Sequence, residues 1–209
     1  MYKSLINKIP NIVSDKTDLS VITVSSEPVE IIAIPNFLST NECNYLCKFL
    51  DKLKIDNSFV SLYSDDVVKT ISLRLSAILD IPVSNAEYMF LGTFRPAVTY
   101  DETIDTNIST EPKLEFESED FAQWSPHGNR LFSCTIFLNE NFVGGTLKYP
   151  DISVDILPEE GKLVIVNLLN EKSQPIKNCK SVHLSVNSNK HIAQICFREQ
   201  PRYTHETEL

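Results

Sequence analysis

Short apolar segments of strand length fill the second half of the chain, and this pattern limits the possible fold more than any other feature. Segments enriched in β-branched and aromatic residues and bounded by turns are typical of β-sandwiches and jelly rolls. Seven of them follow one another between residues 88 and 199: YMFLGTF, RLFSCTIFLN, GTLKYP, SVDIL, KLVIVNLL, KSVHLSV and HIAQICFRE.

The region before these segments has a helical pattern. Residues 29–34, VEIIAI, predict a strand, and a helix is expected to begin after it with Ser39 or Thr40 as its N-cap. A second helix is predicted over about 65–79, where apolar residues recur at helical spacing. Both helices are expected to pack against a sheet, so the fold class is α+β with a sandwich or jelly roll in the C-terminal half.

The chain of 209 residues is long enough for one domain with a sizeable core. Within residues 106–128 an acidic stretch predicts a long loop, which is either a functional lid or a solvated surface insertion. The expected division is an N-terminal extension (1–28), a strand with supporting helices (29–86), a β-rich core (87–199) and a tail (200–209).

Charge and composition exclude several classes of protein. The net charge of −9 argues against nucleic acid as a partner, because phosphate binding needs clustered Lys and Arg. No apolar run reaches the length that spans a membrane, and the N-terminus lacks the apolar core of a signal peptide. Five Cys form no secreted framework, so reduced thiols and a cytoplasmic location are expected.

Several motifs occur in an order that points to one known family. They are NFLSTNECNYL, GNR, FLN, a Gly-Gly pair, YP, and then His183 and Lys190. Over roughly residues 29–199 the chain resembles the catalytic domain of the prolyl 4-hydroxylase branch of Fe(II)/2-oxoglutarate oxygenases. Each motif alone is weak, and their order makes the resemblance specific.

The resemblance implies a double-stranded β-helix (jelly roll) and an Fe(II) site formed by two His and one carboxylate. Asp105 matches the carboxylate ligand and His183 the distal His. Lys190 matches the residue that binds the far carboxylate of the cosubstrate, although its spacing from His183 is shorter than is usual in the family. The implied cofactors are Fe(II), 2-oxoglutarate and ascorbate, and the implied reaction is hydroxylation of a peptidyl or amino-acid side chain in a protein or peptide partner.

One position departs from the pattern of the family. Thr103 occupies the place of the first His in the His-x-Asp motif, and a Thr hydroxyl is a poor ligand for Fe(II). Three alternatives stay open. His127 fills the vacant position, or Glu102 or Asp101 completes a site richer in carboxylates, or the metal site is lost. In the last case the chain is a pseudo-oxygenase that serves as a protein-binding module, so the enzyme assignment depends on this position.

Overall fold

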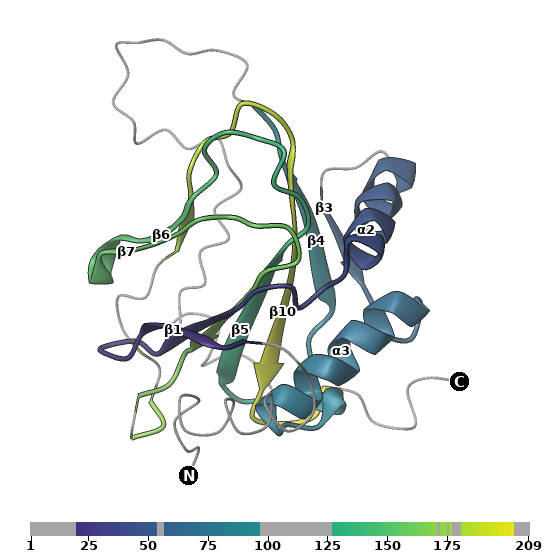
Figure 1. The fold of residues 1–209 in the computed structure, drawn as a ribbon. Helices are drawn as coiled ribbons and strands as arrows, with labels where there is room; N and C mark the ends of the chain where they lie inside the picture. The colour runs from purple at the N-terminus through teal and green to yellow at the C-terminus, as the bar shows by residue number, and fades with distance from the viewer. Residues whose placement is uncertain are drawn as a thin grey trace.

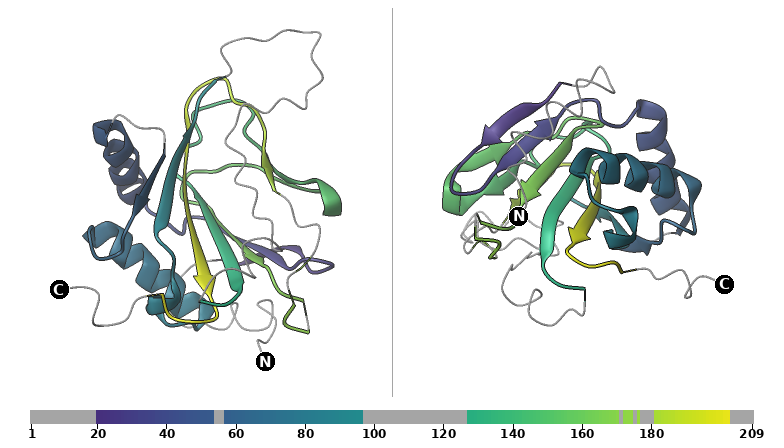
Figure 2. Two further views of the ribbon diagram at one scale, coloured as in Figure 1. Left: turned by 180° about the vertical axis from the view of Figure 1, so that it is seen from behind. Right: turned by 90° about the horizontal axis from the view of Figure 1, so that it is seen from below.

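In the part of the chain that the structure describes, two β-sheets and two α-helices build three layers (Figure 1). The computed structural model describes residues 20–53, 57–96, 127–170, 172–174, 176 and 181–202. A seven-stranded sheet forms the middle layer, and helices α2 (Thr40–Leu53) and α3 (Asp66–Leu79) cover one of its faces. A three-stranded sheet lies on the side away from the helices, as the view from behind also shows (Figure 2).

The neighbouring strands within each sheet are antiparallel. The large sheet has the order β1-β2-β8-β5-β10-β4-β3, and the small sheet has the order β7-β6-β9. The strands are β1 (Ile22–Ser25), β2 (Ile31–Ile34), β3 (Asn57–Val60), β4 (Met89–Phe94), β5 (Arg130–Phe137), β6 (Leu147–Tyr149), β7 (Val154–Ile156), β8 (Leu163–Asn167), β9 (Val182–His183) and β10 (Lys190–Arg198).

Both helices begin at side-chain caps, and the first of these caps, at Ser39, was predicted from the sequence. Ser39 and Glu42 exchange hydrogen bonds in a capping box, with the Ser39 N–H donating to the Glu42 carboxylate at 2.9 Å. The carboxylate of Asp65 accepts from the backbone N–H groups of Val67 and Val68, both at 2.9 Å. These caps fix where each helix starts against the sheet.

The large sheet has two apolar faces, because side chains along a strand alternate between its faces. One face packs against the helices and includes Leu46, Ile71 and Leu75 of the helices with Cys134, Ile195 and Phe197 of the sheet. The opposite face forms the interior of the barrel, where the large sheet meets the small one, and includes Phe137, Leu147, Ile156, Val164 and Ile192.

The predicted fold class is confirmed, and each of the seven predicted segments contains a strand. KSVHLSV contributes only the two residues of β9, and β1 and β3 were not predicted because they are short and partly exposed. Neither described helix has the length and apolar character needed to cross a bilayer. The four cysteines in the described ranges are free thiols, and Cys179 lies outside those ranges.

Candidate ligand-binding site

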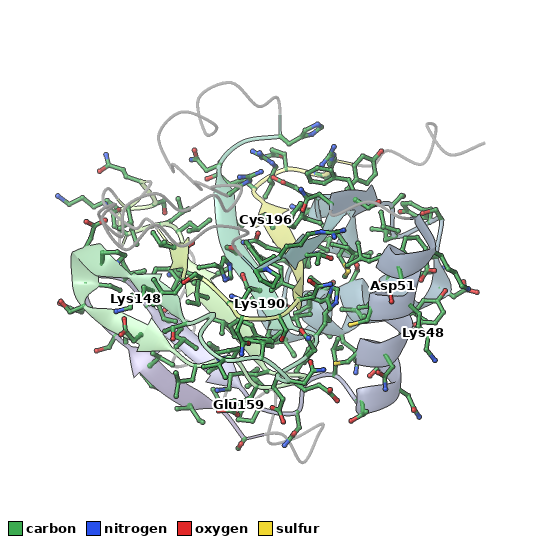
Figure 3. The ribbon with its side chains drawn as sticks, turned by 90° about the horizontal axis from the view of Figure 1, so that it is seen from above. Lys48, Asp51, Lys148, Glu159, Lys190 and Cys196 are labelled. Carbon is green, nitrogen blue, oxygen red and sulfur yellow. The ribbon has the colours of Figure 1, made fainter. Side chains whose placement is uncertain are left out.

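A buried lysine and a histidine meet inside the barrel. The Lys190 side chain has no exposed surface, and Figure 3 shows it near the centre of the molecule. Its Nζ donates to the backbone carbonyl of Gly145 at 2.6 Å and lies 2.6 Å from Nδ1 of His183. We refer to Lys190, His183, Gly145, Phe94 and Phe137 as the Lys190 cluster.

Strand register brings the members of this cluster together. Lys190 opens β10 opposite Phe94 of β4, and Phe137 of β5 lies opposite Ile192, on the same face. His183 comes from the small sheet, where β9 pairs with β6, so it faces Lys190 across the barrel. The cluster therefore depends on both sheets, and neither sheet could form it alone.

The walls of the cluster are aromatic. Lys190 Nζ lies 5.0 Å from the ring centroid of Phe94 and 5.6 Å from that of Phe137, within the range of cation–π attraction. The rings of Phe94 and His183 are 4.7 Å apart between centroids. Such low-polarity surroundings strengthen electrostatic interactions, so an ammonium group here would bind the carboxylate of a ligand well.

His183 is a neutral imidazole in this arrangement. Burial lowers the pKa of His183 well below its usual value, and the neighbouring Lys190 lowers it further. An ammonium group only donates hydrogen bonds, so Nδ1 of His183 accepts, and the single ring proton is on Nε2.

This tautomer does not fit iron binding. A metal ligand needs a free lone pair, but Nε2 carries the proton and Nδ1 is occupied by Lys190. A cationic side chain 2.6 Å from the ring also opposes a second cation. Among the residues that the structure describes, no three His, Cys, Asp or Glu side chains group to hold a metal ion. The described part of the chain thus does not form an iron site by itself.

The structure does not test the rest of the predicted metal site. Thr103 and Asp105 lie outside the described residues, and so do the alternatives Asp101 and Glu102. Most of the predicted loop at 106–128 also lies outside them, and only residues 127 and 128 are described.

His127 is placed at the opposite end of the barrel. Its carbonyl accepts from Gln200 N–H at 3.0 Å, and its Nδ1 lies 2.8 Å from the carbonyl oxygen of Pro201. The nine residues of β10 separate these positions from Lys190, a length of about 26 Å. The structure therefore does not bring His127 to His183, because the chain enters β5 beside the end of β10.

A second, partly buried charge cluster, which the sequence did not reveal, lies near that far end. The guanidinium groups of Arg130 and Arg198 both donate hydrogen bonds to the carboxylate of Glu87. The two hydrogen bonds from Arg130 are each 2.7 Å long. Arg198 also donates to the carbonyl of Gly128 at 2.7 Å. Burial alone would raise the pKa of Glu87, but the two arginines lower it overall. Because its members are far apart in sequence, no local motif could have predicted this cluster.

Comparison with known proteins supports the fold and leaves the chemistry open. No protein-family profile matches the sequence, and no curated protein matches it either. The viral collagen prolyl hydroxylase of Paramecium Bursaria Chlorella virus-1 is similar in structure, with a TM-score of 0.61 and 20% identity over 80% of this chain and 88% of that one. Its 2-oxoglutarate complex gives a TM-score of 0.58 and 19% identity over 89% and 98% of the two chains.

Two cellular prolyl hydroxylases are also similar. A Pseudomonas putida prolyl-4-hydroxylase has a TM-score of 0.54 and 14% identity, covering 93% of this chain and 98% of that one. A Trichoplax adhaerens prolyl hydroxylase, solved with a peptide fragment of the hypoxia inducible factor oxygen degradation domain, has a TM-score of 0.53 and 11% identity over 93% and 89%. At these identities the likeness concerns the fold, and this chain has the fold of the prolyl hydroxylases.

Proposed function

We propose that this protein binds 2-oxoglutarate, or a dicarboxylate of similar length, inside its barrel, with Lys190 contacting one carboxylate. The observation that supports this most directly is the fully buried Lys190 ammonium group between two aromatic rings. Charge-assisted hydrogen bonds are the strong ones, and aromatic surroundings strengthen them further. A structural neighbour that was solved as a 2-oxoglutarate complex supports the choice of ligand.

We further propose that this protein is an Fe(II)/2-oxoglutarate oxygenase that hydroxylates a peptidyl or amino-acid side chain. A peptide or protein substrate is supported by the neighbour solved with a peptide fragment. This form needs metal ligands from the part of the chain that includes Asp105, and it needs His183 to exchange its contact with Lys190 for one with the metal.

The second candidate is a pseudo-oxygenase that binds a protein partner without catalysis. The hydrogen bond between Lys190 and Nδ1 of His183 favours it, because this contact occupies the one predicted metal-binding histidine that the structure places in the barrel. The Thr at position 103 favours it as well, since it removes the first imidazole of the predicted motif.

Calorimetric titration with 2-oxoglutarate, once with Mn(II) and once with a chelator, tests both forms. Lys190→Met should weaken binding by roughly 2–4 kcal/mol, the cost of leaving a buried carboxylate without its cation. Lys148→Met is the matched control, because Lys148 is partly exposed on β6 and pairs with Asp155 at 3.0 Å. It should bind like wild type.

The metal dependence separates the two candidates. Binding that requires Mn(II) would support the oxygenase, and equal binding with the chelator would support the pseudo-oxygenase. If the wild type binds no 2-oxoglutarate under either condition, or if Lys190→Met binds it equally well, the proposed role of Lys190 is wrong.

A further inference from the structure

The two edges of the large sheet differ in how open they are to a further strand. Within the described residues the sheet ends in β1 on one side and in β3, beside β4, on the other (Figure 1). Natural edge strands are usually protected by charged residues, prolines or bulges, because their free N–H and C=O groups can pair with another chain. β1 has such protection, since its register with β2 shifts between Thr23 and Ser25 and a shift of this kind bends a strand.

β3 has none of these protections. Its four residues, NSFV, include no charged residue and no proline, and they pair with β4 in unbroken register. No described strand pairs with the outer side of β3. Phe59 on this strand is 69% exposed, which is unusual for so large an apolar side chain. An uncharged edge with an exposed aromatic ring is open to the addition of a strand from another chain.

Other apolar rings connect Phe59 to the interior of the barrel. Phe59 lies opposite Phe90 of β4, and their ring centroids are 5.3 Å apart. Phe90 is buried in the same interior cluster as Phe94, which lies four residues further along β4 on the same face. The Phe90 ring extends over Gly92, because a Cβ added at Gly92 would lie 2.6 Å from Phe90 Cε1. An apolar track of Phe59, Phe90 and Phe94 therefore runs from the open edge to the Lys190 cluster.

We infer that β3 is a docking edge for an extended, basic segment of a partner protein, which adds as a strand beside β3 and places an apolar side chain on Phe59. Main-chain hydrogen bonds to the edge supply affinity, and the contact with Phe59 selects the side chain. The net charge of −9 favours a basic segment and opposes the pairing of two copies through the same edge. This inference deepens the proposed function and rests on it, since a peptide held on β3 lies at the outer end of the track that leads to the Lys190 cluster.

The probe is the capped heptapeptide Lys-Val-Lys-Phe-Lys-Val-Lys, titrated into isotope-labelled protein at low salt and followed by NMR. In an extended strand its Val and Phe side chains share one face, so the Phe can lie on Phe59. The backbone amide signals of β3, residues 57–60, should shift as the peptide binds. The same peptide with Glu in place of Lys should bind about tenfold more weakly or less, because like charges repel.

Two changes test the contact and the geometry separately. Phe59→Ser should weaken binding of the Lys peptide about fivefold, since it removes an aromatic contact. Val143→Ser is the matched control, because Val143 is 72% exposed in the segment between β5 and β6, and it should bind like wild type. In the peptide, N-methyl groups are placed on one or the other set of alternate residues. An added strand turns only every second N–H toward β3, so one methylated peptide should lose binding and the other should keep it.

The outcomes separate this inference from the proposed function. Signal shifts that leave β3 out, or equal binding of the two methylated peptides, overturn the inference. It is also overturned if wild type sediments as a dimer and Phe59→Ser as a monomer, because a second copy then occupies the edge. If 2-oxoglutarate binds in calorimetry but no peptide binds, only the inference fails. If the peptide binds at β3 and 2-oxoglutarate does not bind, the proposed function fails and the docking edge stands.

Discussion

The two ends of β10 hold buried cations in similar backbone settings but different electrostatic surroundings. Lys190 donates to the carbonyl of Gly145 at 2.6 Å, and Arg198 donates to that of Gly128 at 2.7 Å. Both glycines have positive φ, at 69° and 72°. The arginine end includes the carboxylate of Glu87, whereas the described contacts of Lys190 also include an imidazole and two aromatic rings.

This difference suggests how one structural element can have two roles. At the arginine end Glu87 pairs with both arginines, and these ion pairs join the start of β5 to the end of β10. At the lysine end an ammonium group lies in a setting where the carboxylate of a ligand would interact strongly. The first end is expected to contribute to stability and the second to binding.

The largest effect is expected at the arginine end. Glu87→Leu should lower the free energy of unfolding by about 3–5 kcal/mol, because it leaves the buried guanidinium group of Arg198 and the partly buried one of Arg130 without their carboxylate. Urea denaturation measures this. Asp155→Leu, which breaks the exposed pair with Lys148, should cost no more than about 1 kcal/mol. Similar losses in the two variants would contradict a structural role for Glu87.

The two glycines should respond differently to alanine. At both positions, a side chain at positive φ lowers the free energy of unfolding by about 1 kcal/mol. At Gly145 the added Cβ would also lie 2.7 Å from the Phe142 ring and 2.8 Å from Val186 Cγ1, so overpacking should raise the total loss to about 2–3 kcal/mol. At Gly128 the added Cβ would lie 2.6 Å from Oε2 and 2.9 Å from Cβ of Glu199, so a single, partly exposed residue must shift and the total loss should be smaller than at Gly145. Equal losses in thermal unfolding would show that packing around Gly145 is loose.

Acid should begin to destabilise the lysine end at a higher pH than the arginine end. Burial and then Lys190 lower the pKa of His183 in the folded state, so the unfolded chain takes up the proton first. Stability from this source is present above pH 6.5, the ordinary value, and is lost as the pH falls below it. The lowered pKa of Glu87 gives stability that is present above its ordinary value of 4.5 and lost below it.

Unfolding free energies measured from pH 7.5 to 3.5 check this order. His183→Gln should flatten the upper range, by at most roughly 1.4 kcal/mol per pH unit. His191→Gln is the comparison variant: burial also lowers the pKa of His191, but Asp51 opposes the shift, so this variant should flatten the upper range less than His183→Gln does. An unchanged upper range in His183→Gln would show that His183 is not held neutral.

The smallest effect on stability is expected from Lys190→Met. Replacing a buried cation by an apolar side chain of similar length removes a desolvation cost, but it also leaves the Gly145 carbonyl and Nδ1 of His183 without this donor, and the two effects oppose each other. We expect a change below about 1 kcal/mol in urea denaturation, although ligand binding is lost. A loss as large as that of Glu87→Leu would mean that the lysine end is structural too.

Much of the fold was predictable because its signals are local. The caps at Ser39 and Asp65 and the alternation along β10 are set by residues close together in sequence. Strands β1 and β3 escaped prediction because their pairing with β2 and β4, and not their own composition, stabilises them.

The candidate site was predictable only in part. The sequence singled out Lys190 and His183, but the alternation around Lys190 did not show whether it points inward, and register with Phe94 decides that it does. Nothing in the sequence indicated that Lys190 would contact Nδ1 of His183.

The sequence by itself thus determined the α+β class, the helix caps and the succession of the predicted strands along the chain. Propensity, capping and periodicity act over a few residues. Tertiary structure alone decided which charges meet. It joined Glu87 to Arg130 and Arg198, and it separated His127 from His183 by the length of β10. The physical reason is that hydrogen bonds and ion pairs depend on distances of a few ångströms, and only the pairing and packing of the sheets set such distances between remote residues.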